Sequence, residues 1–285
     1  MSSLDAVLAQ YEKSKQGGGG AQSKMSQEER MKKYFALILG DNESSGSRRI
    51  RILPTPDGSS PFKEAWYHEI QVGGKWQKFY DPGKNDNERS PLNEVYEELV
   101  STGKESDKEL AKQYRSRKFY IVKVIDRDRE ADGPKFWRFK HNYKNEGILD
   151  KIIPIWRNKG DITDPEKGRD LIIELTKSKT PKGKEYTTVS TIMYDDPSPV
   201  HEESVQSKSW VEDELTWQDV YSKKPVEYLE AIARGESPRW DSEKGGYVYG
   251  DSTVSEETIG GTAKSSTKKY QDPQSDSEVD EDLPF

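Results

Sequence analysis

The chain has 285 residues, of which 31% are hydrophobic, 34% charged and 10% aromatic, and its formal net charge at pH 7 is −7. So polar a chain cannot pack uniformly, and we expect an aromatic-rich folded core with long disordered segments. The absence of cysteine excludes disulfides and thiolate metal sites. No apolar run approaches the ~20 residues of a membrane helix, and residues 1–10 lack the basic and apolar regions of a signal peptide. We therefore expect a soluble, cytoplasmic protein.

The charged residues are unevenly distributed along the chain. Residues 240–285 contain 4 Lys and 11 Asp or Glu, whereas residues 104–144 contain 13 Lys or Arg and 7 Asp or Glu. A basic middle followed by an acidic end is typical of chains that handle nucleic acid.

Residues 1–46 are predicted to form an arm joined to the main body. Apolar residues recur there at helical spacing, at Leu4, Val7, Leu8 and Tyr11. The glycines of 17–20 form a flexible linker, and a second helix is predicted over 27–39.

The folded core is predicted to begin near Ser47 and to consist mainly of short strands. Alternation and flanking turn residues predict strands over 49–52, 66–72, 75–80, 118–125, 135–140, 170–175 and 186–194. Gly73-Gly74 is a two-residue hairpin turn between the second and third of these strands.

Helices are predicted between and after these strands. Ser90 fits a helix N-cap, with Pro91 at the first helical position. Further helical patterns cover 107–114, 148–156 and 217–234, and Pro225 must break or kink the last of these. From Gly235 onward, the polar low-complexity sequence predicts disorder.

These elements favour a β-rich α+β fold. We expect a five-stranded barrel of the oligonucleotide-binding (OB) type, with inserted helices and a small subdomain. The predicted organisation is an N-terminal arm over 1–46, a core over 47–235 with an inserted subdomain at 81–115, and a disordered acidic tail over 236–285.

Two of the predicted strands interleave aromatic rings and cations. The first includes Arg115, Arg117, Lys118 and Phe119, and the second reads KFWRFK over 135–140. Single-stranded nucleic acid needs both residue types, because cations follow the phosphates while rings stack on exposed bases at roughly 1–3 kcal/mol each.

Strand alternation assigns these residues to faces. The predicted groove faces carry Arg115, Arg117 and Phe119 on one strand and Phe136, Arg138 and Lys140 on the other. The opposite faces, predicted to be core, carry Tyr120, Val122, Val124, Trp137 and Phe139. The alternative is that all the rings are core and the cations only solvate an exterior.

Other chemistry has weaker support in the sequence. The acids of 126–132 resemble the start of a calcium loop, but Ala131 stands where glycine is required. The three histidines are dispersed, and we find no phosphate-binding loop and no catalytic triad. We therefore predict no enzymatic activity. The alternatives are a structural or scaffold protein that does not bind DNA and, third, a nuclease whose metal ligands are the 126–132 acids.

The C-terminal end of the chain carries a second signal. Residues 270–285 contain six acids and no base, and the chain ends Asp280-Glu281-Asp282-Leu283-Pro284-Phe285. An extended chain with Pro before Phe can place a ring and a carboxylate in a partner's pocket, while the acids engage its basic rim. We predict a partner-binding tail, and the alternative is a repulsive, solvated tail.

Several segments share the order and rough spacing of one known family. They are Arg49-Ile50-Arg51-Ile52-Leu53-Pro54, Pro61-Phe62, Gly74-Lys75-Trp76, the strand 115–125, Trp137-Arg138-Phe139 and Leu149-Asp150-Lys151-Ile152. Over roughly 47–195 the chain resembles the single-stranded DNA-binding (helix-destabilising) protein of T-even-type bacteriophages. The resemblance implies cooperative coating of single strands in replication, recombination and repair, in the cytoplasm of an infected bacterium. It also implies contact with polymerase, helicase-loading and recombination proteins.

The resemblance also implies site residues. It places candidate base-contacting rings at Trp76, Phe119, Trp137 and Tyr186. With the strand pattern, the candidate DNA-binding residues are Trp76, Tyr80, Arg115, Arg117, Lys118, Phe119, Phe136, Trp137, Arg138, Lys140 and Tyr186.

Two features depart from this family. Its well-known members bind zinc through one His and three Cys, and His68 lies at the position of that His. The cysteine region holds Ser90, Pro91 and their neighbours instead. We therefore expect no zinc and no other cofactor. The family's basic N-terminal cooperativity motif is also missing, since residues 1–10 contain no Lys or Arg.

Overall fold

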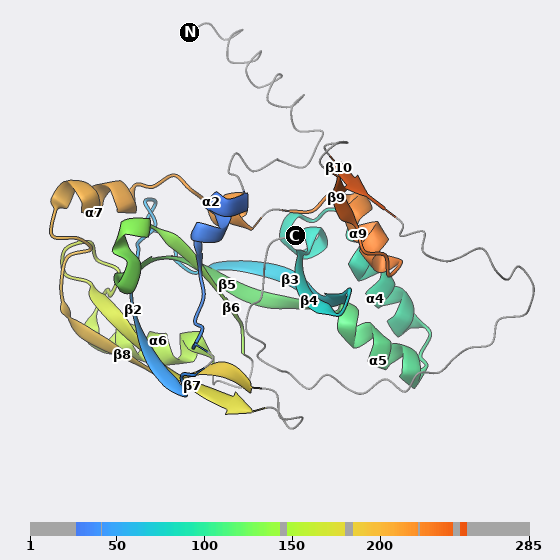
Figure 1. Cartoon of the computed structure of the whole chain (residues 1–285), viewed down its shortest axis with the longest axis horizontal. Coiled ribbons are helices and arrows are strands. Elements are labelled where there is room, and N and C mark those ends of the chain that lie inside the picture. Colours follow the sequence, from blue (N-terminus) through green and yellow to red (C-terminus); the bar gives the residue numbers. More distant parts are fainter. Residues whose placement is uncertain are drawn as a thin grey trace, which may run out of the picture. The chain divides into compact units, whose positions relative to one another are not determined.

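The computed structural model describes residues 27–40, 42–142, 147–179, 185–221, 223–241 and 246–249. The described residues form a mixed α+β fold around one large sheet (Figure 1). Its eight strands are β1 (Tyr34–Phe35), β2 (Ser45–Ile52), β3 (Lys63–Val72), β4 (Lys75–Tyr80), β5 (Ser116–Asp126), β6 (Lys135–Lys140), β7 (Arg169–Lys179) and β8 (Glu185–Pro197). A separate two-stranded sheet contains β9 (Arg239–Asp241) and β10 (Gly246–Val248).

The helices vary from one turn to three. They are α2 (Gln27–Lys32), α3 (Pro82–Asp86), α4 (Pro91–Ser101), α5 (Glu105–Tyr114), the 3₁₀ helix η2 (Arg127–Asp132), α6 (Ile148–Lys159), α7 (Ser204–Val211), α8 (Trp217–Val220) and α9 (Val226–Ala233). None of the described helices has the length and apolar character needed to cross a membrane.

The large sheet is open. Its main path runs β1-β6-β5-β2-β7-β8, and β3 pairs with both β5 and β4. The pairings β2–β5, β2–β7, β5–β6 and β7–β8 are antiparallel. The expected five-stranded barrel is not confirmed, because eight strands enter one sheet and that sheet does not close.

Within the described ranges, the chain divides into two compact units. The first unit contains residues 27–67 and 117–223, and the second contains residues 68–116 and 224–249. The second unit therefore includes the segment 81–115, which the sequence predicts to be an inserted subdomain.

The core of the first unit lies between one face of the sheet and α6. Ile50 and Ile52 of β2 and Leu171 and Ile173 of β7 are fully buried there, and Ile152 of α6 packs against them. α6 continues through Pro154 to Lys159, three residues beyond the predicted helical pattern over 148–156. The apolar face of the helix is anchored in this core, and tertiary packing of this kind offsets the loss of one backbone hydrogen bond.

The second unit contains the β3–β4 turn with strand β4, and its four described helices are α3, α4, α5 and α9. The two turn glycines have positive φ angles of 59° for Gly73 and 82° for Gly74, as a tight hairpin requires. Phe79 and Leu92 are buried against Leu229 and Ile232 of α9. Pro225 precedes α9 as its N-cap residue and separates it from α8, so the predicted helix over 217–234 is two helices.

Two short elements differ from the sequence-based prediction. The predicted helix over 27–39 ends at Lys32, and the chain then forms β1, which pairs with Phe136 and Trp137 of β6. A hairpin is also present where disorder is predicted, with Trp240 opposite Tyr247. In β1 the Phe35 ring is buried beside Trp137, and in β10 the Tyr247 ring packs on Tyr228. Local sequence patterns do not encode such contacts between distant segments.

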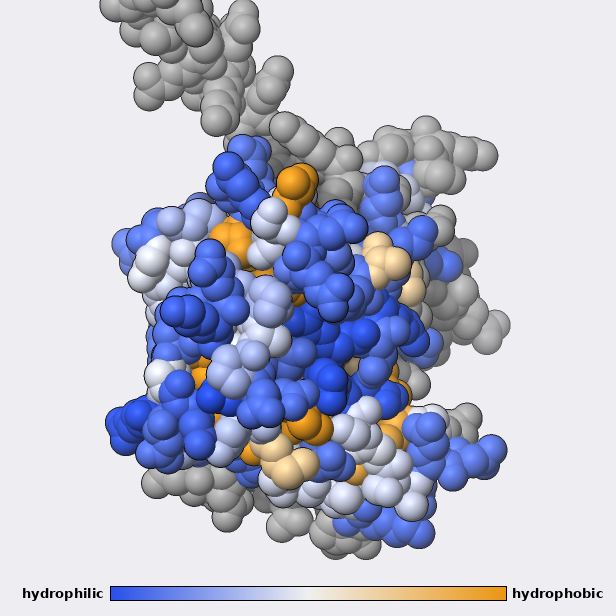
Figure 2. Space-filling view, turned by 90° about the vertical axis from the view of Figure 1, so that its left-hand side faces the viewer, coloured by the Kyte–Doolittle hydropathy of each residue, from blue (hydrophilic) through white to orange (hydrophobic). Residues whose placement is uncertain are grey.

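Figure 2 shows one face of the molecule. Its surface is largely hydrophilic, and the apolar side chains visible on it form small, separated patches. Scattered patches of this kind are ordinary for a protein surface.

Candidate nucleic-acid interface

The antiparallel pair β5–β6 brings the predicted rings and cations together. Its register places Phe119 opposite Lys140, Ile121 opposite Arg138, and Lys123 opposite Phe136. We call these six residues the outer face. Predicted groove residues Phe119, Phe136, Arg138 and Lys140 therefore do lie on the same side of the two strands, as the alternation predicts.

Rings and cations on the outer face contact one another. Lys140 Nζ lies 5.9 Å from the centroid of the Phe119 ring, and Lys123 Nζ lies 5.5 Å from that of Phe136. The guanidinium carbon of Arg138 lies 5.8 Å from the Phe119 ring and 4.9 Å from the Tyr67 ring. These distances are within cation–π range. On the outer face, aromatic rings and cations thus alternate, and each ring has a cation beside it.

The outer face is not open to solvent in this conformation. The exposed fractions are 2% for Phe119, 4% for Phe136 and 8% for Arg138. Tyr67 packs edge-on against Phe119 with a centroid distance of 5.6 Å. Bases could stack on these rings only after the covering side chains move.

Part of the cover comes from residues 198–221, which we call the strap. Val200 and Trp210 of the strap pack with Leu53 and Ile125. Asp213 and Tyr221, further along the strap, contact the cations of the outer face. The strap includes α7 and α8, and α7 is labelled in Figure 1.

The sequence patterns do not point to the strap or to three residues that complete this arrangement, Tyr67, Lys123 and Tyr221. A usable signal was present in the composition. The strap holds six acids, one Lys and several aromatic residues, which is the charge complement of the basic-aromatic strands.

The opposite side of the strand pair, the inner face, is core. Val122, Val124, Trp137 and Phe139 belong to the cluster that includes α6. Trp137 is 3% exposed, and its ring lies 6.0 Å from Phe35 and 4.7 Å from Phe139. This placement agrees with the alternation argument rather than with the base-contacting role that the resemblance implies for Trp137.

Three further candidates in the first unit lie away from the centre of the outer face. Lys118 forms an ion pair with Glu64 at 2.6 Å and lies 5.4 Å from the Tyr120 ring. Arg117 is half-buried on β5. Tyr186 is half-buried on β8, opposite Ser178.

The remaining candidates, Trp76, Tyr80 and Arg115, belong to the second unit. Trp76 is 37% exposed on β4, whereas Tyr80 is buried and donates a hydrogen bond of 2.7 Å to Asp86 Oδ1. The structure thus gathers four of the eleven predicted residues, Phe119, Phe136, Arg138 and Lys140, on the outer face.

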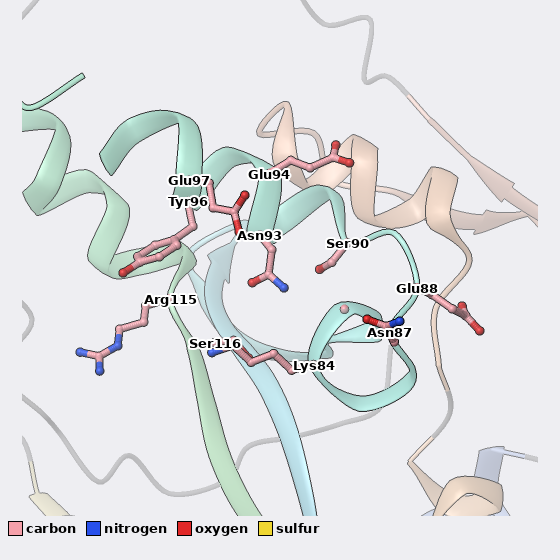
Figure 3. A pocket seen from close by; sticks show the side chains of 11 residues that line it. Lys84, Asn87, Glu88, Ser90, Asn93, Glu94, Tyr96, Glu97, Arg115 and Ser116 are labelled. Carbon is pink, nitrogen blue, oxygen red and sulfur yellow. The ribbon is translucent and has the colours of Figure 1, made fainter. Parts of the chain in front are cut away.

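The exposed Arg115 lines a hollow of about 580 Å³ in the second unit. In Figure 3, the Asn93 side chain extends from α4 toward this hollow, while Glu94 points away. The charged residues that line the hollow are three acids, Glu88, Glu94 and Glu97, and two cations, Lys84 and Arg115. Because the acids outnumber the cations, this hollow is less suited to a phosphate backbone than the outer face.

A buried polar cluster lies beside the hollow, at the position that the resemblance assigns to zinc. His68 and Asp81 are fully buried, with 3.6 Å between Nε2 and Oδ2. His68 Nδ1 donates to the carbonyl oxygen of Tyr114 at 2.7 Å. Asp81 accepts hydrogen bonds from Asn93 at 2.8 Å and from the backbone N–H of Gly83 at 2.9 Å.

The cluster controls the charge of Asp81. Burial by itself raises the pKa of Asp81, but His68, Ser116 and Asn93 stabilise the carboxylate and bring its pKa well below the ordinary value. Among the described residues, no group of three or more His, Asp or Glu side chains is arranged to hold a metal ion.

The acidic loop 126–132 forms the 3₁₀ helix η2 and takes part in ion pairs. Asp132 lies 2.8 Å from Lys135 Nζ, and Glu130 pairs with Arg127. Asp126 accepts a hydrogen bond from the backbone N–H of Asp128 and lies 3.6 Å from Lys135 Nζ. Three of its four acids therefore already have cationic partners.

Two predicted regions lie outside the described residues. They are most of the arm, up to residue 26, and the tail end Asp280, Glu281, Asp282, Leu283, Pro284 and Phe285.

Comparison with known proteins provides no independent assignment. Neither a scan against models of protein families nor a search of curated proteins finds a match to this chain. The function therefore has to be argued from the residues and their arrangement.

Proposed function

We propose that this protein binds single-stranded DNA without sequence preference and coats it during phage replication, recombination and repair. The observation that carries the proposal is the outer face of β5–β6, where each ring lies beside a cation. On such a surface, rings can stack on the bases of a single strand while cations bind its phosphates.

The chemistry favours single strands over duplex. A duplex presents phosphates but hides the faces of its bases inside the stack, so it could use only Lys123, Arg138 and Lys140. A single strand could also stack on Phe119 and Phe136. Stacking is tolerant of sequence because every base has a π-face, so the proposed recognition is general.

Three finer assignments belong to the same proposal. An OB-type core is supported by the antiparallel strands β2, β5, β6, β7 and β8, which share one apolar face packed on α6. The arm over 1–46 would mediate self-association along the strand. The acidic tail would recruit polymerase, helicase-loading and recombination proteins in the infected bacterium. We propose no enzymatic activity.

A titration tests the DNA-binding proposal. Fluorescently labelled oligo-dT and a duplex of equal length are titrated with the full chain at several salt concentrations. We expect tighter binding to oligo-dT, with log affinity falling by about 0.7 per phosphate contact for each unit of log salt. Preference for the duplex, or no binding to either, would falsify the proposal.

A second experiment tests the tail. Phe285→Ala removes a ring but no charge, so we expect unchanged DNA affinity and loss of capture of purified replication proteins. Deletion of 270–285 is the companion variant, and it should tighten DNA binding at low salt because six acids no longer compete for the cations. Capture that survives in Phe285→Ala would assign recruitment to the acids alone.

A further inference from the structure

The strap places an anion where a phosphate would be expected. Lys123 Nζ donates to the carbonyl oxygen of Asp213 at 2.7 Å and lies 3.4 Å from Asp213 Oδ1. The same ammonium group lies over the Phe136 ring. Lys123 is therefore held between a ring on its own face and an anionic group above it.

The strap also places a ring where a base would be expected. The Tyr221 ring centroid lies 4.4 Å from the guanidinium carbon of Arg138, which is closer than the Tyr67 and Phe119 rings. Tyr221 Oη donates to the carbonyl oxygen of Phe136 at 3.2 Å. Stacking on an Arg guanidinium is one way in which proteins hold unpaired bases.

The composition of the strap agrees with these two contacts. It holds six Asp or Glu residues and one Lys, interspersed with Trp210, Trp217 and Tyr221. An acidic peptide segment with aromatic rings resembles a single strand of DNA, because its carboxylates correspond to phosphates and its rings to bases. The outer face beneath it carries cations and rings.

We infer that the strap is an internal mimic of single-stranded nucleic acid, and that DNA displaces its segment 213–221 from the outer face. This inference rests on the proposed function and deepens it, since the strap contacts mark where phosphates and bases bind. Asp213 marks a phosphate position over Lys123, and Tyr221 marks a base position over Arg138.

The two ends of the strap are held differently. At its start, Arg127 forms two hydrogen bonds to Asp170, of 2.8 and 2.9 Å, and donates to the carbonyl oxygen of Val200 at 2.8 Å. Further along, the Lys123–Asp213 pair keeps side-chain exposures of 19% and 24%. A partly exposed ion pair is screened by water and salt and is easily exchanged for another. Release therefore begins at the Lys123–Asp213 pair, while the start of the strap stays attached.

A cover of this kind lowers the apparent affinity for DNA by the fraction of molecules in which it is open. Weakening the cover should therefore tighten DNA binding. Asp213→Asn removes the negative charge that faces Lys123. It keeps a side-chain oxygen that can accept the hydrogen bond from the backbone N–H of Leu215, which is 2.7 Å from Asp213 Oδ1. Glu212→Gln is the matched control, because its side chain is 61% exposed and lies near Lys208 at 3.8 Å.

The experiment compares oligo-dT affinities of the full-length wild type and both variants at low and high salt. We expect Asp213→Asn to bind up to about fivefold more tightly at low salt, with a smaller gain at high salt, and Glu212→Gln to match the wild type. An equal gain in both variants would indicate a general charge effect and overturn the mimicry, as would no gain in either.

Hydrogen exchange of the full chain separates this inference from the proposed function. With saturating oligo-dT, we expect amides of 213–221 to lose protection while amides of 198–200 keep theirs. If oligo-dT binds and 213–221 stays protected, the mimicry is wrong although the protein still binds single strands. If oligo-dT does not bind at all, the proposed function itself has failed.

Discussion

The two faces of the β5–β6 pair are covered in chemically different ways. On the inner face, Val122, Val124, Trp137 and Phe139 pack against α6 and the rest of the apolar core. On the outer face, Lys123 and Arg138 are covered through ion-pair and cation–π contacts with the strap. Apolar packing has no substitute partner in water, whereas a cation can exchange a carboxylate for a phosphate. The same two strands therefore have one face that stays packed in the core and one face whose cations a polyanion can bind.

The largest expected effect comes from the inner face. Trp137→Ala should lower the free energy of unfolding by about 3–5 kcal/mol, because it leaves a large cavity in the core. Chemical denaturation monitored by circular dichroism measures this loss. If the variant keeps its stability and loses DNA binding, Trp137 contacts bases and our division into faces is wrong.

A fully buried His68–Asp81 pair sharpens the contrast with the partly exposed Lys123–Asp213 pair. Asp81→Asn should lower the free energy of unfolding by about 1–3 kcal/mol, because it removes the buried carboxylate that accepts hydrogen bonds from Asn93 and from the backbone N–H of Gly83. Asp213→Asn should cost under about 1 kcal/mol by the same denaturation assay. Equal costs would show that exposure does not distinguish the two pairs.

The Asp81 pair also predicts a pH dependence. Because the folded state lowers the pKa of Asp81, its stabilising contribution is complete above the unfolded pKa of about 3.9 and is lost as the pH falls below it. Unfolding midpoints measured between pH 6 and pH 2 should therefore fall less steeply for Asp81→Asn than for wild type. Parallel pH profiles would contradict the assigned pKa shift.

A smaller effect is expected at the far end of the strap. Tyr221→Phe keeps the ring over Arg138 but removes the hydrogen bond to the Phe136 carbonyl oxygen. We expect a loss of about 0.5–1.5 kcal/mol in unfolding free energy, together with slightly tighter oligo-dT binding. Weaker oligo-dT binding would mean that Tyr221 contacts DNA directly instead of standing in for a base.

The smallest effect concerns a single phosphate contact. Arg117→Ala should reduce the slope of log affinity against log salt by about 0.7, the value for one contact to a single strand. Glu64→Gln tests the neighbouring pair, because it frees Lys118 from its 2.6 Å partner, and it should strengthen binding. A salt slope unchanged in Arg117→Ala would place that side chain off the DNA path.

The sequence predicted the strand pair because alternation is a local property. Residues 118–125 and 135–140 were assigned as strands, and the structure has β5 over Ser116–Asp126 and β6 over Lys135–Lys140. The shared face of Phe119, Phe136 and Arg138 follows from the same period-two geometry. The cover over that face does not follow from local geometry, because α7 and α8 are short. The position of the strap depends on contacts between residues some 90 positions apart, such as Lys123 with Asp213.

Other failures of prediction have the same origin. β1 has two residues, too few for a periodic pattern, and it forms because β6 offers an edge for pairing. The five-stranded barrel is not confirmed, since it rests on the number of short strands and strand count does not determine whether a sheet closes. The His68–Asp81 pair joins residues with no motif spacing, and only the fold brings them together.

Photocrosslinking tests most directly whether single strands bind the outer face. The full chain is irradiated with oligo-dT that carries 5-iodouracil, and crosslinked peptides are identified by mass spectrometry. We predict crosslinks to peptides containing Phe119, Phe136 or Tyr67, and loss of those crosslinks when unlabelled oligo-dT is in excess. Crosslinks confined to peptides containing Trp76 or Trp240, with none on β5 or β6, would contradict the account.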